Sequence, residues 1–64
     1  MKHEVIMIYY NANPFITPDC DYLHWVVFMT LKEMAETKRA SSAMGGYVDF
    51  YGVDDGYNYM RLVS

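Results

Sequence analysis

The chain is poor in cysteine, the residue that stabilises many small domains through disulfides or metal sites. Only one of its 64 residues is a cysteine, Cys20, so an internal disulfide cannot form and a zinc site of several thiolates is excluded. A lone thiol is typical of a reducing compartment, which predicts a cytoplasmic protein. A chain of this length buries only about 60% of the surface that its unfolded form exposes. We therefore expect one marginally stable domain, residues 1–64, that gains stability from a partner surface.

Basic residues are also scarce. Five Lys and Arg stand against eight Asp and Glu, which gives a net charge of −3. Because contacts to phosphates need clustered Lys and Arg, this balance argues against a nucleic-acid partner. No apolar run reaches the roughly 20 residues that cross a bilayer, and the run Val5–Tyr10, interrupted upstream by Glu4, is too short for a signal peptide. No membrane partner is expected.

Apolar and aromatic residues are plentiful instead. Hydrophobic residues make up 53% of the chain, with seven Tyr and six Met. Residues 4–10 are β-branched, aromatic and apolar on both alternating faces, which is typical of a strand covered on both sides. Residues 47–53 and 57–63 predict a hairpin around the turn Asp54-Asp55-Gly56, with the glycine in the left-handed conformation.

The stretch between these strands, residues 18–40, predicts one long helix. Thr17 suits the N-cap and Pro18 the first helical position. Asp19 and Asp21 place negative charge at the positive end of the helix dipole, and basic residues occupy the far end.

These elements predict a single α+β domain with the order β-α-β-β. We favour a three-stranded antiparallel sheet in the order 2-3-1, with the first strand at one edge and the helix packed on one face. The alternative order, 1-2-3, would pair the first two strands in parallel through a right-handed crossover.

A helical wheel gives the predicted helix two apolar sides. The side that should pack on the sheet comprises Leu23, Val27, Leu31 and Met34. Trp25 and Met29 fall roughly opposite, with Tyr22 nearby, and we interpret them as anchors of a partner interface, since Trp is enriched at binding hot spots. The alternative is a rotated helix with Trp25 at the edge of the core.

The predicted hairpin presents a second candidate surface. Its register places five candidate binding residues on the sheet face away from the helix, together with Arg61: Tyr47, Asp49, Tyr51, Tyr57 and Tyr59. Tyrosines give protein-binding surfaces a large rigid area at a low entropy cost. A solvated face of tyrosines packed on each other ranks second. Base stacking by a single-stranded nucleic acid ranks third, because the chain has few basic residues.

The first strand offers a third route to association. An apolar edge strand is an aggregation hazard unless another strand covers it, so a homodimer could form through residues 4–10 or through the outer helix face. This is the basis of an alternative function as a structural homo-oligomer subunit.

The sequence contains only weak signatures of catalytic, metal-binding or phosphate-binding sites. Cys20 and His24 are four residues apart and could share a helix face, but no third group completes a catalytic or metal site, so a packed structural pair is favoured. The acidic residues do not follow a calcium-loop spacing, and no glycine-rich phosphate loop precedes the helix. We predict no catalytic, cofactor-binding or metal-binding residue, and no enzymatic activity.

The leading functional hypothesis is a small non-enzymatic protein-binding module, an inhibitor or adaptor of another protein. We recognise no family across the chain. Size and acidity suggest an analogy with small phage or mobile-element proteins that inhibit a nucleic-acid-processing machine of the host, which is an argument from composition alone.

Overall fold

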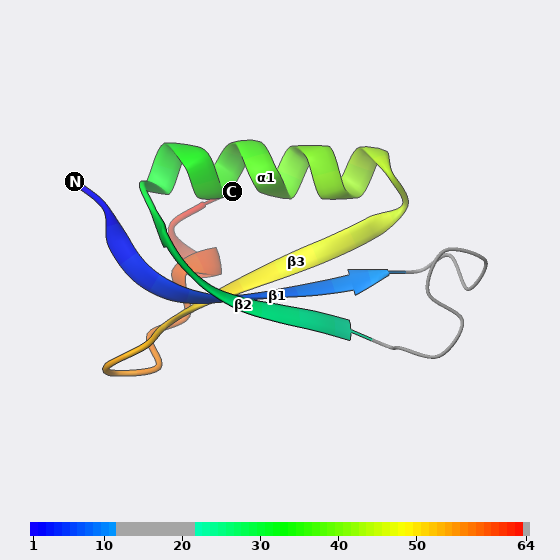
Figure 1. Cartoon of the computed structure of the whole chain (residues 1–64). Coiled ribbons are helices and arrows are strands. Elements are labelled where there is room, and N and C mark those ends of the chain that lie inside the picture. The colour runs from blue at the N-terminus through cyan, green and yellow to red at the C-terminus, as the bar shows by residue number, and fades with distance from the viewer. Residues whose placement is uncertain (12–21, 64) are drawn as a thin grey trace.

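A computed structural model describes residues 1–11 and 22–63 of the chain. In order, its elements are the strands β1 (His3–Asn11) and β2 (Tyr22–Met29), the helix α1 (Leu31–Ala43), the strand β3 (Gly46–Gly52) and the short 3₁₀ helix η1 (Tyr59–Arg61). Figure 1 shows α1 above the sheet and η1 beneath the helix.

The predicted fold class is confirmed. The three strands form one sheet in the order β2-β1-β3, with the helix packed on one face. Both strand pairs are antiparallel, as the favoured order required, and the parallel alternative does not occur. The position of β1 differs from the prediction, because it lies in the centre and not at an edge. Both of its edges are paired, which removes the basis for a homodimer through residues 4–10.

The predicted helix over residues 18–40 is wrong in its first half. Residues 22–29 form strand β2, and residues 18–21 lie outside the described part of the chain. The sequence Trp25-Val-Val-Phe28 is β-branched and aromatic, which favours a strand. A strand with two apolar faces also shows apolar residues on all sides when its sequence is drawn on a helical wheel.

Thr30 is the true start of the helix. Its hydroxyl accepts a hydrogen bond from the Glu33 backbone N–H at 3.0 Å, and the Glu33 carboxylate accepts one from the Thr30 N–H at 2.8 Å. This reciprocal pair is a capping box. The helix ends before Gly45, whose φ of +83° is the left-handed conformation that favours glycine.

The predicted hairpin is correct in its first strand and wrong in its second. β3 matches residues 47–53 to within one residue, and Gly56 has the predicted left-handed φ, +68°. Residues 57–63 form no strand, and a single bridge joins Asn58 to Tyr51. The Asn58 side chain instead caps η1 by accepting a hydrogen bond from the Met60 N–H at 3.0 Å.

The segment of residues 57–63, which includes η1, completes the hydrophobic core. Among the described residues, the hydrophobic side chains that are almost fully buried are Val5, Met34, Val48, Phe50 and Val63. Tyr59 and Met60 pack against them from η1. An extended strand over residues 57–63 would point only alternate side chains inward, whereas the turn brings Tyr59, Met60 and Val63 to the core together.

Close packing also requires a glycine at position 46. A Cβ atom on Gly46 would lie 2.6 Å from the carbonyl oxygen of Tyr10, a backbone atom that cannot move aside. The start of β3 therefore tolerates only glycine where it pairs with the end of β1.

Candidate protein-binding surface

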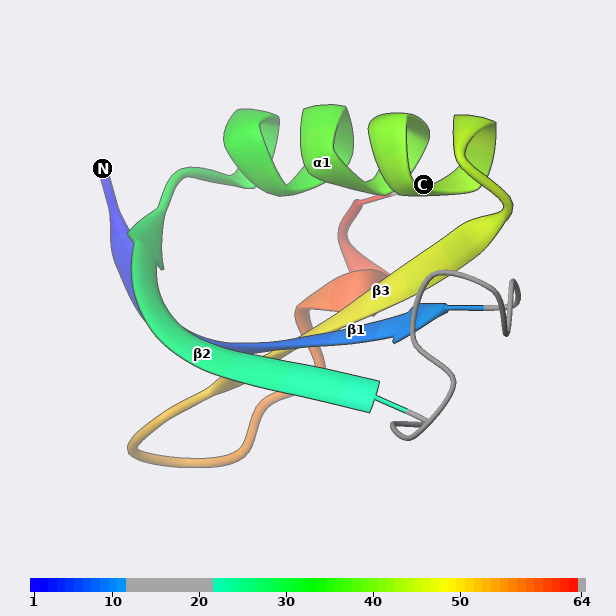
Figure 2. The ribbon, with the colours of Figure 1, turned by 45° about the vertical axis from the view of Figure 1, so that its right-hand side comes forward.

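The sheet has one covered and one uncovered face. Val5, Val48 and Phe50 point toward α1 and are buried. Side chains alternate along each strand, so their neighbours lie on the opposite face. With the strand registers, the described side chains of that face are Glu4, Ile6, Ile8 and Tyr10 of β1, His24, Val26 and Phe28 of β2, and Tyr47, Asp49 and Tyr51 of β3. We call it the open face, because no described helix or strand covers it (Figures 1 and 2).

The open face is largely apolar and accessible to solvent. Val26 is 58% exposed, Phe28 63% and Tyr47 56%. Ile6 and Ile8 lie between the outer strands and are half-buried by their neighbours. Since isolated apolar side chains on a surface are normal but a contiguous patch is not, this face has the character of an interaction site.

Two tyrosines make one end of the open face rigid. The rings of Tyr10 and Tyr47 stack with centroids 4.9 Å apart and planes inclined by 20°. Tyr22 is in register with Tyr10, so three tyrosine positions lie side by side across the sheet. A stacked pair offers a large contact area that is already ordered before a partner binds.

The charges on this face are acidic. Glu4 and Asp49 are its carboxylates, and none of its described positions carries Lys or Arg. Arg61, which the predicted register placed beside the tyrosines, lies in η1, whose residues Tyr59 and Met60 pack against the core. Base-stacking surfaces need cations along the backbone path, so the nucleic-acid alternative gains no support.

The predicted anchors on the helix do not lie on a helix. Trp25 and Met29 belong to β2 and occupy the helix-side face, in register with Met7 and His3. Met29 packs against the core, whereas Trp25 remains 45% exposed. The prediction that Trp25 and Met29 form an outer helix face is therefore wrong, and the homodimer proposed through that face loses both anchors. The side chain of Tyr22 lies outside the described set.

The five residues predicted for the tyrosine face divide into two groups. Tyr47, Asp49 and Tyr51 lie on the open face as predicted. Tyr57 and Tyr59 do not lie on the sheet, since they follow the turn after β3. The Tyr59 ring packs on the core and on His3, whose Nδ1 is 3.4 Å from the Tyr59 hydroxyl. Tyr57 contacts Tyr59 edge to face.

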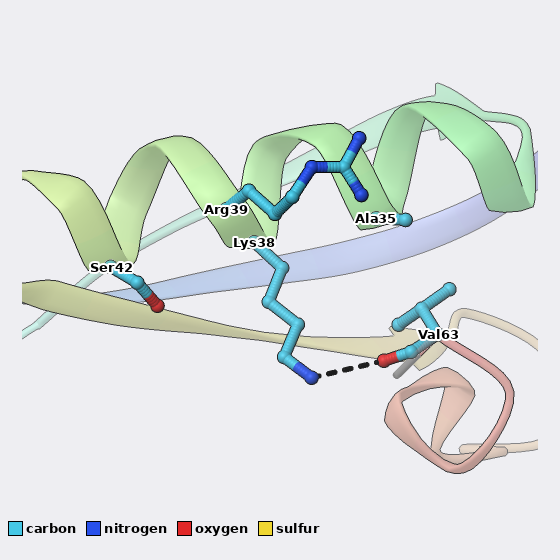
Figure 3. A pocket seen from close by; sticks show the side chains of 5 residues that line it. All are labelled: Ala35, Lys38, Arg39, Ser42 and Val63. Carbon is cyan, nitrogen blue, oxygen red and sulfur yellow. Dashed lines mark hydrogen bonds between the residues drawn. The ribbon is translucent and has the colours of Figure 1, made fainter.

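A hollow of about 290 Å³ lies between α1 and the end of the described chain. It is lined by Ala35, Lys38, Arg39, Ser42 and Val63. In Figure 3, Lys38 reaches to the Val63 carbonyl, to which its Nζ donates at 3.2 Å, while Arg39 points away from Val63. The volume is at the lower limit of small-molecule sites. With one cation already engaged, the hollow is better explained as helix packing than as a ligand site.

The described residues hold little further chemistry. No group of three or more His, Cys, Asp or Glu among them is placed to hold a metal ion. Cys20 lies outside the described chain, and His24 lies on a strand, so the helical geometry that suggested a pair is lost. The pKa of Glu33 is lowered, first by the hydrogen bond from the Thr30 N–H and then by the charge of Lys2, 3.8 Å away. Within residues 1–11 and 22–63, no helix is long and apolar enough to cross a bilayer.

Sequence reasoning assigned no binding role to the other residues of the open face: Glu4, Ile6, Ile8, Tyr10, His24, Val26 and Phe28. A signal was present for the β1 residues, because residues 4–10 are apolar on both faces while one helix can cover only one. The β2 residues were hidden by the helical interpretation of residues 22–29.

Comparison with known proteins supplies no function. No protein-family model, no curated protein and no solved structure matches the chain. The case for function therefore depends on the geometry of the open face.

Proposed function

We propose that the chain is a small, non-enzymatic binding module that docks another protein on its open face, as an inhibitor or adaptor in the cytoplasm. One observation supports this most strongly. An apolar sheet face with Val26, Phe28 and Tyr47 each more than half exposed has no covering element among the described residues. Water contact with such a surface is unfavourable by roughly 25 cal/mol for each Å² of apolar area.

The composition of the face suits a protein partner. Ile6 and Ile8 lie on its central strand, the stacked Tyr10 and Tyr47 lie at one end, and Glu4 and Asp49 are its carboxylates. Large aromatic residues dominate the free energy of protein interfaces. The acidic pair favours a partner whose apolar patch is bordered by Lys or Arg. A basic enzyme that acts on nucleic acid has such a surface, which is consistent with the hypothesis of a phage or mobile-element inhibitor.

Paired tyrosine variants test this proposal. Affinity capture with the purified chain, followed by mass spectrometry, identifies the partner, and titration then measures its affinity for each variant. The double variant Tyr47→Ser/Tyr51→Ser removes aromatic area from the open face on the strand farthest from β2. We expect it to weaken binding by about tenfold or more, the loss typical of a hot-spot residue.

The matched control is Tyr57→Ser, which removes an exposed tyrosine that is not on the sheet. This variant should bind as the unmodified chain does. A partner that binds the double variant and the unmodified chain equally would show that the open face is not the interface.

A further inference from the structure

The two edge strands of the sheet differ in what lies beside them. Along β3, the Gly52 N–H donates to the Tyr57 carbonyl at 2.8 Å, and the Gly52 carbonyl accepts from the Gly56 N–H at 2.9 Å. The following segment therefore turns back against this edge. β2 is the other edge strand. Its eight residues include no Pro, Gly, Lys, Arg, Asp or Glu, the residues that usually prevent an edge strand from pairing.

The direction of the β2 backbone groups follows from one hydrogen bond. Val53 N–H donates to the Glu4 carbonyl at 3.2 Å, so Glu4 faces β3. In antiparallel sheets the N–H and C=O of one residue point to the same side, and successive residues alternate. Val5 and Met7 therefore face β2, where they pair with Val27 and Trp25.

The remaining residues of β2 face outward. The backbone groups of Tyr22, His24, Val26 and Phe28 thus point away from β1. The same alternation predicts that Gly52 faces outward on β3, and its hydrogen bonds to Tyr57 and Gly56 agree. Val26 and Phe28 therefore present donors and acceptors along the outer edge of β2.

Both sides of this edge are accessible. Trp25 is 45% exposed on the helix side, and Val26 and Phe28 are more than half exposed on the open face. The helix lies mainly over β3 and touches β2 little. A strand added beside β2 would meet side chains on both faces as well as backbone groups.

We propose that a second copy of this chain occupies the edge, with the two β2 strands antiparallel about a two-fold axis normal to the sheet. Such pairing places each strand against itself. Because β2 carries no formal charge other than a titratable histidine, self-pairing opposes no like charges among Asp, Glu, Lys and Arg. A small domain with five almost fully buried apolar side chains also gains most from a second copy.

Geometry selects the register. Opposite residues must lie on the same face of the joined sheet, which allows the axis to pass through Trp25 or through Val26. An axis at Val26 would set Tyr22 against Thr30 of the second copy. The Thr30 N–H and carbonyl already bond to Glu33 and Met34.

An axis at Trp25 avoids this conflict. It sets Tyr22 against Phe28 and His24 against Val26, each twice, at the hydrogen-bonded positions of an antiparallel pair. The two copies of Trp25 lie opposite each other at a non-hydrogen-bonded position with Cα atoms about 4.5 Å apart, where aromatic pairs are favourable.

The dimer would change the surface available to other proteins. A two-fold axis normal to the sheet keeps both open faces on one side and both helices on the other. Two three-stranded sheets would become one continuous sheet with a joined open face. This association uses a different surface from the proposed function and does not depend on it.

Hydrogen exchange tests the pairing without any substitution. Sedimentation should show the unmodified chain as a dimer at high micromolar concentration. The Val26 and Phe28 amides should exchange slowly in the dimer and quickly on dilution. The Trp25 and Val27 amides, which face β1, serve as internal controls and should be protected throughout. A chain that stays monomeric, or a dimer whose Val26 and Phe28 amides still exchange quickly, would overturn the proposal.

Substitutions then locate the interface. Val26→Pro removes an outward N–H, which a strand edge tolerates, and should weaken dimerisation at least about tenfold. Val26→Thr keeps the N–H and the branched shape and should dimerise normally. Trp25→Lys places like charges on the axis and should also give monomers, while Trp25→Phe should not. Circular dichroism confirms that each variant is folded.

The open-face double variant Tyr47→Ser/Tyr51→Ser separates the two proposals. It should dimerise as the unmodified chain does even where it no longer binds the partner protein. A dimer that resists Val26→Pro and Trp25→Lys but is lost in this double variant would be a face-to-face assembly, which contradicts the edge-to-edge pairing.

Discussion

The two faces of the sheet are built from the same three strands but meet different surroundings. On β3, Val48 is 1% exposed, while its neighbour Tyr47 is 56% exposed on the other face. Both faces are apolar, yet α1 and η1 lie on one of them (Figure 1). Among the described elements, the helix and the 3₁₀ helix cover one face only. An uncovered apolar face is what the proposed docking of a partner on the open face requires.

Truncating one aromatic residue on each face is the sharpest test of this contrast. Phe50→Ala removes a fully buried ring beneath α1 and should cost about 3–5 kcal/mol of unfolding free energy. Tyr47→Ala removes a half-exposed ring on the same strand and should cost about 1 kcal/mol or less. Urea unfolding followed by circular dichroism measures both. Equal losses would mean that the open face is packed as tightly as the core.

Weakening the helix should make the two faces more alike. Thr30→Ala removes the capping hydroxyl and should lower the unfolding free energy by about 1 kcal/mol. Because α1 covers Phe50 and Val48, a looser helix should also increase binding of an apolar dye. Ser42→Ala, near the exposed end of the same helix, is the control and should change neither quantity. A Thr30→Ala variant as stable as the unmodified chain would show that the capping box contributes nothing.

Acid should act on the same cap with a smaller effect. The pKa of Glu33 in the folded chain lies below its ordinary value of 4.5, so the carboxylate stabilises the fold above that pH. This contribution is lost as the pH falls through the lowered pKa. Glu33→Gln keeps an acceptor for the Thr30 N–H without titrating, so its stability should depend less on pH in that window.

Glu36→Gln changes an exposed carboxyl of α1 outside the cap and is the matched control. The slope of unfolding free energy against pH, measured from pH 5 downward, should be unchanged in this variant. An identical slope for the Glu33→Gln variant would exclude the cap as a source of the pH dependence.

The sequence was sufficient to predict the fold class, but not to predict which segments form the helix and the strands or how they are connected. Residues 4–10 and 47–53 have strong local signals, since β-branched and aromatic residues end at Asn or Gly, and both strands are present. The segment 22–29 satisfies the helical wheel as well as the strand pattern, because it is apolar at nearly every position. The motif Thr30-Leu-Lys-Glu33 could have resolved the ambiguity, since a capping box marks the start of a helix.

The candidate site shows the same division. Tyr47, Asp49 and Tyr51 were placed on the correct face because β3 was assigned correctly. Trp25 and Met29 were misplaced with the helix. Tyr57 and Tyr59 were misplaced because the core required a turn at η1, a demand that no local pattern reveals.

The central position of β1 also determines when the sheet can be completed during translation. β1 is synthesised before either of its neighbours, and β2 can pair with it as soon as Met29 is available. The other edge of β1 stays unpaired until Gly46–Gly52 have been made, and Val63 closes the core still later. The edge of β1 that faces β3 is therefore the last edge of this strand to be paired.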